Sequence, residues 1–280
     1  MSTITVVGAG WLGLPLCENL ALKGHTVYAS RTTEEGKNEL SSKGLHAFVS
    51  NLNEPASNGL SSILLSQQSE IVVGSFPPGF RKGNSTGYID SWRNLIAQVR
   101  KSNAKKLIMI SSTTVYPNLA EDMSEDAASL ALAEQYDHFS DNARTMLQAE
   151  QLLIDSGLDY VILRCSGLIG PNRNPARFAS KLKQISRSAP ANMLHLQDAV
   201  DIATFAIENA SNTILNATTP NCLSKSEFYP LAIEKAKLDD IVLPPIVDIP
   251  DKRILCNKLI ALGYQFTFDN LPSALDDING

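Results

Sequence analysis

The sequence predicts an α/β protein with a doubly wound, mostly parallel sheet. Short apolar runs alternate with helical patterns over residues 4–164. The first run leads directly into a G-x-G-x-x-G turn from Gly8 to Gly13. The runs are continuous rather than alternating, as in Ile71-Val72-Val73, which is typical of strands that helices cover on both faces. Together these observations indicate a sheet of the Rossmann type.

The elements follow one another regularly along the chain. Strands are expected over 4–7, 25–29, 45–49, 70–75, 106–111, 159–164 and 213–217. Helices are expected over 14–23, 34–43, 57–67, 86–101, 142–156, 175–185, 198–208 and 226–237. After residue 170 strand and helix patterns no longer alternate regularly. We therefore expect a main domain over 1–170, to which part of the later chain returns, and a small substrate or lid lobe over 171–280.

The glycine turn carries the first functional prediction. Gly8 makes the tight turn, Gly10 leaves room for a pyrophosphate, and Gly13 lets the first helix pack closely on the strand. Trp11 and Leu12 lie between them, at the helix N-terminus. Unpaired backbone N–H groups and the positive end of the helix dipole favour an anion there. The turn therefore predicts a dinucleotide site.

The end of the second strand decides which dinucleotide is expected. A carboxylate about 20 residues beyond the glycines would bind a ribose 2′-hydroxyl and repel a 2′-phosphate. This chain has Ser30, Arg31, Thr32 and Thr33 instead. A guanidinium beside hydroxyls suits a phosphate dianion, so we expect NADP(H) in preference to NAD(H). The alternative is that Arg31 is a solvated loop residue.

Ligands of such sheets bind beyond the carboxyl ends of the strands. This rule selects the loops 51–53, 75–81, 111–116 and 165–177 in addition to the first two turns. From them we expect coenzyme contacts by Asn51, Leu52, Ser75, Phe76, Pro77, Ser111, Cys165 and Gly167. Weaker candidates for binding an anionic substrate are the segment 80–83, Arg173 and Arg177, because a solvated loop charge is the better explanation of each. Asp198 is expected to cap its own helix.

Three motifs carry a family resemblance. Ser111-Ser112-Thr113-Thr114-Val115-Tyr116 follows a strand, Leu163-Arg164 precedes Gly167 to Pro171, and His195 stands three residues before Asp198. In this order they resemble the extended short-chain dehydrogenases/reductases, the epimerase/dehydratase group. The resemblance runs from the first glycines to about Val200. It implies a nicotinamide coenzyme, hydride transfer at a carbonyl or sugar-type substrate, and a substrate-oxygen role for Ser112.

The chain departs from that group at one motif. Active members carry Tyr-x-x-x-Lys on the helix after the serine strand, whereas this sequence has Ser140 and Arg144 at those places. Arg144 retains a fixed positive charge that can hold ribose hydroxyls. The hydroxyl of Ser140 is far less acidic than a phenol, so it is a poor proton donor. Tyr116, Tyr136 and His138 are the candidate replacements.

The composition excludes several classes of function and partner. The net charge of −5 and pI near 5.4 argue against nucleic acid or an anionic membrane as the main partner. The four cysteines are isolated, so neither a disulfide framework nor a metal site is expected. No leader or spanning segment is apparent, which favours a cytoplasmic location. A small-molecule substrate is expected, and a homodimer is compatible with this composition.

Two functional hypotheses stay open, with a third ranked last. The first is an NADP(H)-dependent oxidoreductase or epimerase-like enzyme using Ser112, Ser140 and Arg144. The second is a protein that binds or senses NADP(H) without turnover, which the missing Tyr and Lys favour. The third is a hydroxyacid or nucleotide-sugar dehydrogenase, which shares the glycine turn. That class needs a long all-helical second domain, and the second half of this chain does not show one.

Overall fold

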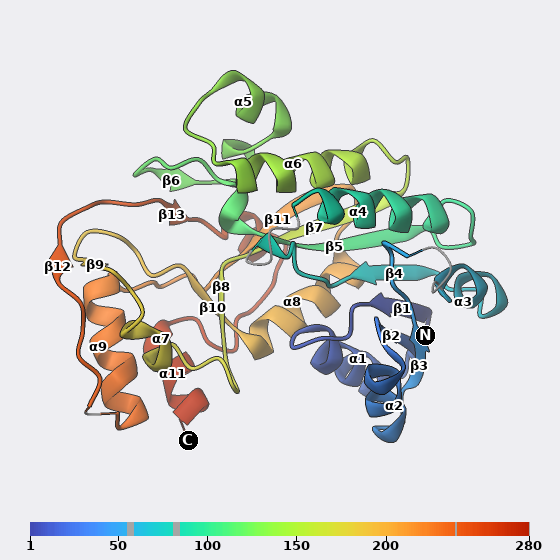
Figure 1. The fold of residues 1–280 in the computed structure, drawn as a ribbon, viewed down its shortest axis with the longest axis horizontal. Helices are drawn as coiled ribbons and strands as arrows, with labels where there is room; N and C mark the ends of the chain where they lie inside the picture. Colours follow the sequence, from blue (N-terminus) through green and yellow to red (C-terminus); the bar gives the residue numbers. More distant parts are fainter. Residues whose placement is uncertain (55–58, 81–84, 239, 280) are drawn as a thin grey trace.

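A computed structural model describes residues 1–54, 59–80, 85–238 and 240–279. Its centre is a seven-stranded sheet in the order β3-β2-β1-β4-β5-β7-β11, and every neighbouring pair is parallel (Figure 1). The strands are β1 (Thr3–Val7), β2 (Thr26–Arg31), β3 (His46–Val49), β4 (Ile71–Gly74), β5 (Lys106–Ser112), β7 (Asp159–Cys165) and β11 (Thr213–Ala217). The strand order reverses between β1 and β4, which is where such sheets bind ligands.

Helices cover both faces of the sheet (Figure 1). One layer contains α1 (Gly13–Leu22), α2 (Glu34–Ser42) and α8 (Leu196–Asn209), whose buried residues share one core. The other contains α3 (Leu60–Ser66), α4 (Ser85–Val99) and α6 (Asp141–Ile154), which bury theirs in a second core. The predicted doubly wound α/β class is therefore confirmed.

The two cores explain why the strands are short and continuously apolar. Successive side chains of a strand point to opposite faces. Val72 lies in the second core and Val73 in the first, and both are 0% exposed. The next residue, Gly74, leaves room for Trp92 of α4, because a Cβ there would lie 2.3 Å from the indole ring. A strand buried on both faces favours apolar side chains at successive positions, and the sequence pattern reflects this.

The later chain adds three small parallel pairs. They are β8 (Gly167–Ile169) with β10 (Met193–His195), β9 (Ile185–Ser186) with β12 (Ile246–Val247), and β6 (Asp122–Met123) with β13 (Arg253–Ile254). The remaining helices are α5 (Leu130–Gln135), α7 (Ala176–Ala179), α9 (Lys225–Ala236), α10 (Asn257–Ala261) and α11 (Leu271–Asn279). The helices α7, α9 and α11 enclose a third core, which includes Phe228 and Leu275. The predicted division at residue 170 stays a prediction.

Two local predictions were wrong. The helix expected over 175–185 ends at Ala179, because Ile185 instead joins β9 and donates its N–H to the carbonyl of Pro245. That partner lies far along the chain, so local periodicity could not indicate it. Asp198 does not cap α8; the Nδ1 atom of His195 does, accepting from the N–H of Gln197 at 3.2 Å.

Asp198 instead holds the C-terminal segment against α8. Its buried carboxylate accepts hydrogen bonds from the backbone N–H groups of Thr267 and Phe268, at 2.8 and 3.0 Å, and from the Tyr264 hydroxyl. Burial raises its pKa, although these three bonds oppose the shift. The residue thus joins the late chain to the Rossmann layer.

Candidate functional site

The glycine turn at the switch point has the shape that a dinucleotide requires. Gly8 has a φ of +94°, and a Cβ on it would lie 2.7 Å from the Ser75 carbonyl oxygen. A Cβ on Gly13 would lie 2.4 Å from the Gly8 oxygen, so only glycine allows this close packing. A Cβ on Gly10 would meet only the Gly8 oxygen, at 3.9 Å. The backbone at Gly10 therefore borders open space that a diphosphate can approach.

The start of α1 offers donors to that space. Leu12 provides no side-chain cap, and the first turn of α1 holds no acidic residue. The backbone N–H groups of Trp11 and Leu12 find no acceptor among the residues that the structure describes. Unpaired amides at the positive end of a helix bind anions. These residues therefore fit the diphosphate of a dinucleotide coenzyme.

Ser30 supports the turn from behind. Its hydroxyl accepts a hydrogen bond from the Gly8 N–H at 3.1 Å, and its carbonyl accepts from the Ala9 N–H at 2.9 Å. The residue is 1% exposed. Its predicted contact with the coenzyme stays untested, but its position shows a structural role that the sequence did not reveal.

Arg31 lies at the carboxyl end of β2, against the start of α2. A Cβ on Gly36 would lie 2.9 Å from the Arg31 Cβ, so this glycine makes room for the arginine stem. The Nη2 atom is 3.5 Å from Oε2 of the exposed Glu39. The buried Nε atom has no hydrogen-bond partner in the described structure. A buried N–H without an acceptor is uncommon in folded proteins. The Arg31 side chain as a whole is 28% exposed.

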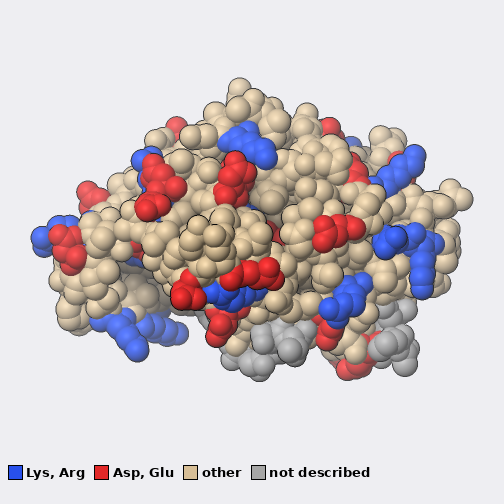
Figure 2. All heavy atoms as spheres, turned by 90° about the horizontal axis from the view of Figure 1, so that it is seen from above, with Lys and Arg blue, Asp and Glu red and all other residues tan. Residues whose placement is uncertain are grey.

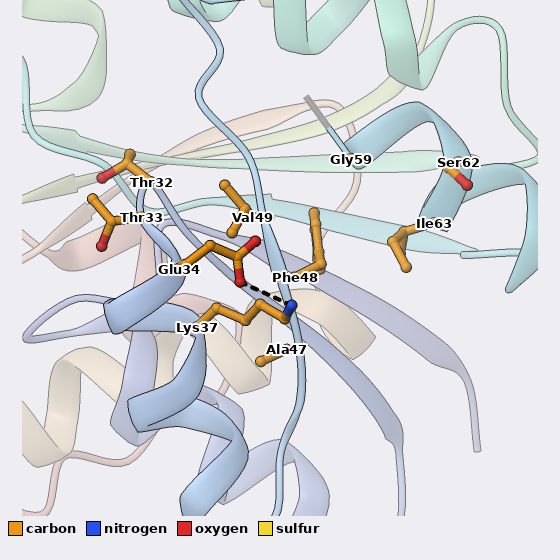
Figure 3. A pocket seen from close by; sticks show the side chains of 10 residues that line it. All are labelled: Thr32, Thr33, Glu34, Lys37, Ala47, Phe48, Val49, Gly59, Ser62 and Ile63. Carbon is orange, nitrogen blue, oxygen red and sulfur yellow. Dashed lines mark hydrogen bonds and ion pairs between the residues drawn. The ribbon is translucent and has the colours of Figure 1, made fainter. Parts of the chain in front are cut away.

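A hollow of about 780 Å³ adjoins this arginine loop (Figure 3). Thr32 and Thr33 border it on one side, and α3 borders it with Ser62 and Ile63. Glu34 and Lys37 form an ion pair of 3.0 Å along its wall. The volume is within the range of small-molecule sites.

The other predicted coenzyme residues occupy the neighbouring strand ends. The Asn51 side chain accepts from the N–H of Asn53, Leu52 is 7% exposed, and the Ser75 N–H donates to the Val7 carbonyl. The Phe76 ring packs on Trp92 with centroids 4.7 Å apart, whereas Pro77 is exposed. Of the weaker anion candidates, residues 81–84 lie outside the described residues.

Trp11 connects the glycine turn to the loop after β8. Its indole N–H donates to the Pro171 carbonyl at 2.8 Å, and the Arg173 guanidinium lies 4.3 Å above its ring. Gly170 allows this contact, since a Cβ there would lie 3.3 Å from the indole. Arg173 therefore has a stacking role that the sequence did not indicate.

The two serines that end β5 have different surroundings. The Ser111 hydroxyl is buried and donates to Oε1 of Glu150 at 2.6 Å. The half-buried Ser112 hydroxyl accepts from the Thr114 N–H at 3.2 Å and lies 3.0 Å from the Thr114 hydroxyl. Side chains alternate along a strand, so the two hydroxyls point to opposite faces of the sheet. Ser112 has the exposure that a substrate contact needs.

Ser140 and Arg144, predicted from the sequence to stand at the Tyr and Lys places of the family motif, both make local bonds. Ser140 is the N-cap of α6, and its hydroxyl accepts from the Ala143 N–H at 3.2 Å. The Arg144 guanidinium donates to the Tyr136 carbonyl at 2.9 Å. Tyr136 itself is 42% exposed, and its ring stacks on His138 with centroids 5.3 Å apart. The serine keeps a hydroxyl proton to donate, and Arg144 keeps other N–H groups.

Tyr116 is excluded as the replacement proton donor by its burial. Its hydroxyl donates to Oδ1 of Asn216 at 2.6 Å and accepts from Nη1 of Arg164 at 3.2 Å. Burial raises its pKa to about 12, against the opposing charge and hydrogen bond of Arg164. Arg164 is itself 1% exposed and pairs with Glu150 at 2.7 Å. The network is a rigid support beneath the strand ends.

The end of β7 and the strand β8 hold two of the predicted coenzyme residues, Cys165 and Gly167. Cys165 is 3% exposed, and burial raises the pKa of its thiol to about 12, so it is an unreactive core residue. A Cβ on Gly167 would lie 2.6 Å from the Met193 sulfur, which explains the glycine. Among the described residues no three His, Cys, Asp or Glu side chains gather as metal ligands.

Figure 2 shows the face seen from above, where Lys and Arg alternate with Asp and Glu among a majority of other residues. The drawn residues form no broad field of one sign on this face. In the described part of the chain, no helix combines the length and the apolar character that a membrane span requires.

A glycine-rich turn at the switch point of a seven-stranded parallel sheet defines a dinucleotide-binding protein of the Rossmann class. The chain belongs to the NAD(P)H-binding family, whose model matches residues 8–211. It is also similar to Protein YeeZ of Escherichia coli strain K12, with 24% identity over 96% of this chain and 97% of that protein.

Solved structures share the whole fold. The UDP-glucose 4-epimerase of Thermotoga maritima, solved with UDP-glucose, has a TM-score of 0.77 at 18% identity, covering 99% of this chain and 97% of its own. The dTDP-glucose 4,6-dehydratase of Bacillus anthracis, solved with NAD, has a TM-score of 0.78 at 14% identity, covering 99% and 95%. The fold is therefore that of the epimerase/dehydratase group, as the sequence motifs predict.

Proposed function

We propose that the protein is an NADP(H)-dependent oxidoreductase or epimerase-like enzyme that acts on a small carbonyl or sugar-type substrate. The close contact between Gly13 and Gly8, with open space at Gly10, is the observation that carries the coenzyme site. When bound, the coenzyme supplies or accepts a hydride. The chain's part is to hold the diphosphate on the α1 amides, orient the substrate oxygen with Ser112, and place the positive charge of Arg144 nearby.

The preference for NADP(H) rests on Arg31. Its Nε donor is buried and unpaired, and its exposed ion pair with Glu39 is long enough at 3.5 Å to be replaced at little cost. A 2′-phosphate at the end of β2 would form charge-assisted bonds with the part of the guanidinium that is exposed. The hollow beside Thr32 lies next to this position and supplies space for the adenosine end.

The substitution Arg31→Asp is expected to reverse the coenzyme preference. Loss of charge-assisted bonds, each of about 1.5–3 kcal/mol, weakens NADPH binding by about ten- to a hundred-fold. Affinity for NADH should stay equal or improve, because a carboxylate accepts from the 2′-hydroxyl. Calorimetric titration with both coenzymes measures the change. Arg100→Asp, an exposed site with the same charge change, is the control.

Glu39→Gln provides an independent check, since it frees the guanidinium and should tighten NADPH binding. A wild-type protein that binds NADH more tightly than NADPH would contradict the Arg31 assignment. The Rossmann fold would be unaffected by that result.

A second candidate function is a protein that binds or senses NADP(H) without turnover. The observation favouring it is that Ser140, at the place of the catalytic phenol, caps α6, while Tyr116 is buried. The other proposed phenol, Tyr136, is the C-cap of α5 and lies four residues before Ser140.

The double variant Ser140→Tyr with Arg144→Lys separates the two functions. We expect NADPH oxidation by a panel of aldehydes and ketones to rise about a hundred-fold or more, because general acid catalysis is restored. Loss of the Ser140 cap should cost about 1 kcal/mol of stability. Absorbance of NADPH measures turnover.

The comparison with the wild type decides between the candidates. Activity in both proteins supports the enzyme, and activity in the double variant alone supports the binding protein. Adding Ser112→Ala to the double variant is the control, and it should remove the activity. Silence of the double variant despite bound NADPH would contradict Ser112 as the substrate contact.

A further inference from the structure

A second hollow lies where residues 118–120, which follow β5, meet the segments 184–189 and 249–251 and the start of α9. Its volume is about 350 Å³, and its polar wall comprises Asn118, Gln184, Ser186, Lys225 and Asp251. Leu119 and Ile249 belong to its apolar part. A mostly concave site with a few convergent polar groups is the usual form of a small-molecule site. None of these residues has a role in the coenzyme site described above.

Two lysines share the carboxylate of Asp251. Lys225 lines the hollow, whereas Lys252 adjoins it through its contacts with the lining residues Asp251 and Asn118. The Lys225 Nζ atom is 2.9 Å from Oδ2 of Asp251, and the Lys252 Nζ atom is 3.8 Å from Oδ1 of the same residue. Lys252 also donates to Oδ1 of Asn118 at 3.3 Å. The cluster thus carries one positive charge in excess. Helix α9 begins at Lys225, so the positive end of its dipole adds to this potential.

The excess charge is poorly solvated. The Lys252 side chain is only 16% exposed. Burial lowers its pKa, and the nearby charge of Lys225 lowers it further, although Asp251 opposes both effects. Glu227, on the first turn of α9, accepts from the Ser224 N–H and hydroxyl, and in the described structure it forms an ion pair with neither lysine. A bound anion would supply the missing counter-charge.

Hydrogen bonds connect this hollow to the candidate site. The Asn118 N–H donates to the His138 carbonyl at 2.9 Å, two residues before Ser140. Asn192 donates through Nδ2 to the Lys252 carbonyl at 2.9 Å, and its own carbonyl accepts from the Gly167 N–H at 3.1 Å. Hydrogen bonds therefore link the lysine cluster to the segment before α6 and to the loop after β7.

We propose that this hollow binds an anionic oxygen group of the substrate, a carboxylate or a phosphate, with Lys225 and Lys252 as its counter-charges. That the anion belongs to the substrate rests on the proposed function. The occupant is a compact group, because the volume is at the small end of ligand sites and the excess charge is one. Ammonium groups act on it as point charges, so they accept either anion.

The test uses inorganic phosphate and acetate as probes for the two anions. The full chain, with and without NADPH, is titrated with each while its amide NMR spectrum is followed. We expect saturable shifts at residues around the hollow, such as Asn118, Ser186 and Lys225. The probe that binds with the higher affinity identifies the group that the substrate carries.

Variants make the test specific. Lys252→Met should weaken binding of the tighter probe about ten-fold or more, because a charged donor is lost. Asp251→Asn should instead tighten it, because the competing carboxylate is gone. Lys258→Met, an exposed lysine on α10, is the control with the same charge change. Should Lys252→Met fail to fold, Lys225→Met replaces it.

Three outcomes would overturn the proposal. They are the absence of saturable shifts around the hollow, equal affinity in Lys252→Met and the wild type, and weaker binding in Asp251→Asn. Titration of the same variants with NADPH keeps the proposed function separate. If the wild-type protein did not bind NADPH, that result would contradict the proposed function alone. Anion binding at the lysines would still be measurable.

Discussion

Gly10→Ala is expected to abolish tight NADPH binding while leaving the free energy of unfolding nearly unchanged. A Cβ at this position has open space, with its nearest neighbour 3.9 Å away, so the fold accommodates the methyl group. The methyl group would occupy the space in which the diphosphate approaches the α1 amides. Losing two charge-assisted bonds of about 1.5 kcal/mol each weakens binding about a hundred-fold. Calorimetric titration and denaturant unfolding measure the two quantities.

Gly13→Ala is the contrasting variant. Its Cβ would lie 2.4 Å from the Gly8 carbonyl oxygen, so α1 must move away from β1. We expect a loss of about 1–3 kcal/mol of stability in addition to the loss of coenzyme. Gly44→Ala, remote from the turn and with nothing within 4 Å, should leave NADPH affinity unaltered. Undiminished NADPH affinity in Gly10→Ala would refute the diphosphate site.

Glu150→Ala is expected to have the largest effect on stability. Glu150 and Arg164 are 1% exposed, and the carboxylate also accepts from the buried Ser111 hydroxyl at 2.6 Å. Removing one member of a buried pair leaves the other charge uncompensated, which costs about 3–5 kcal/mol. Arg164 would retain its bonds to the Glu125 and Ala128 carbonyls, at 2.8 and 3.0 Å, but no counter-ion at its Nε. Denaturant unfolding measures the loss.

The double variant Glu150→Leu with Arg164→Met distinguishes the charge from the packing. It should recover part of the lost stability, because apolar residues of similar volume often replace a buried pair well. Glu134→Ala, an exposed position on α5, is the control. A change below about 1 kcal/mol for Glu150→Ala, the scale of an exposed pair, would show that the pair is not desolvated in solution.

The sheet was largely predictable because its signals are local. The strand 213–217 was predicted with the bounds that β11 has, and the helix over 34–43 differs from α2 by one residue. Continuous apolar runs arise wherever helices cover both faces, as Val72 and Val73 illustrate. The glycine turn was predictable because its three glycines lie within six residues directly after a strand, a spacing that is itself the signal.

The partners of the polar site residues were not predictable. Ser30 and Gly8 are 22 residues apart, Ser111 and Glu150 are 39 apart, and Trp11 and Pro171 are 160 apart. Nothing in the local sequence distinguishes a serine that supports a turn from one that contacts a ligand. Likewise Lys252 and Asn118 are 134 residues apart, so the lysine cluster had no sequence signal at all.

The amino-acid sequence by itself determined the parallel sheet, the order of its elements, the dinucleotide turn and the absence of the Tyr-x-x-x-Lys pair. These follow from periodicity, glycine spacing and residue identity, which act over a few residues. Only the tertiary structure decided that Tyr116 is buried, that Asp198 holds the C-terminal segment, and that Lys225 and Lys252 converge on Asp251. Burial and charge pairing depend on distances in space between residues far apart in the chain, and the fold alone establishes those distances.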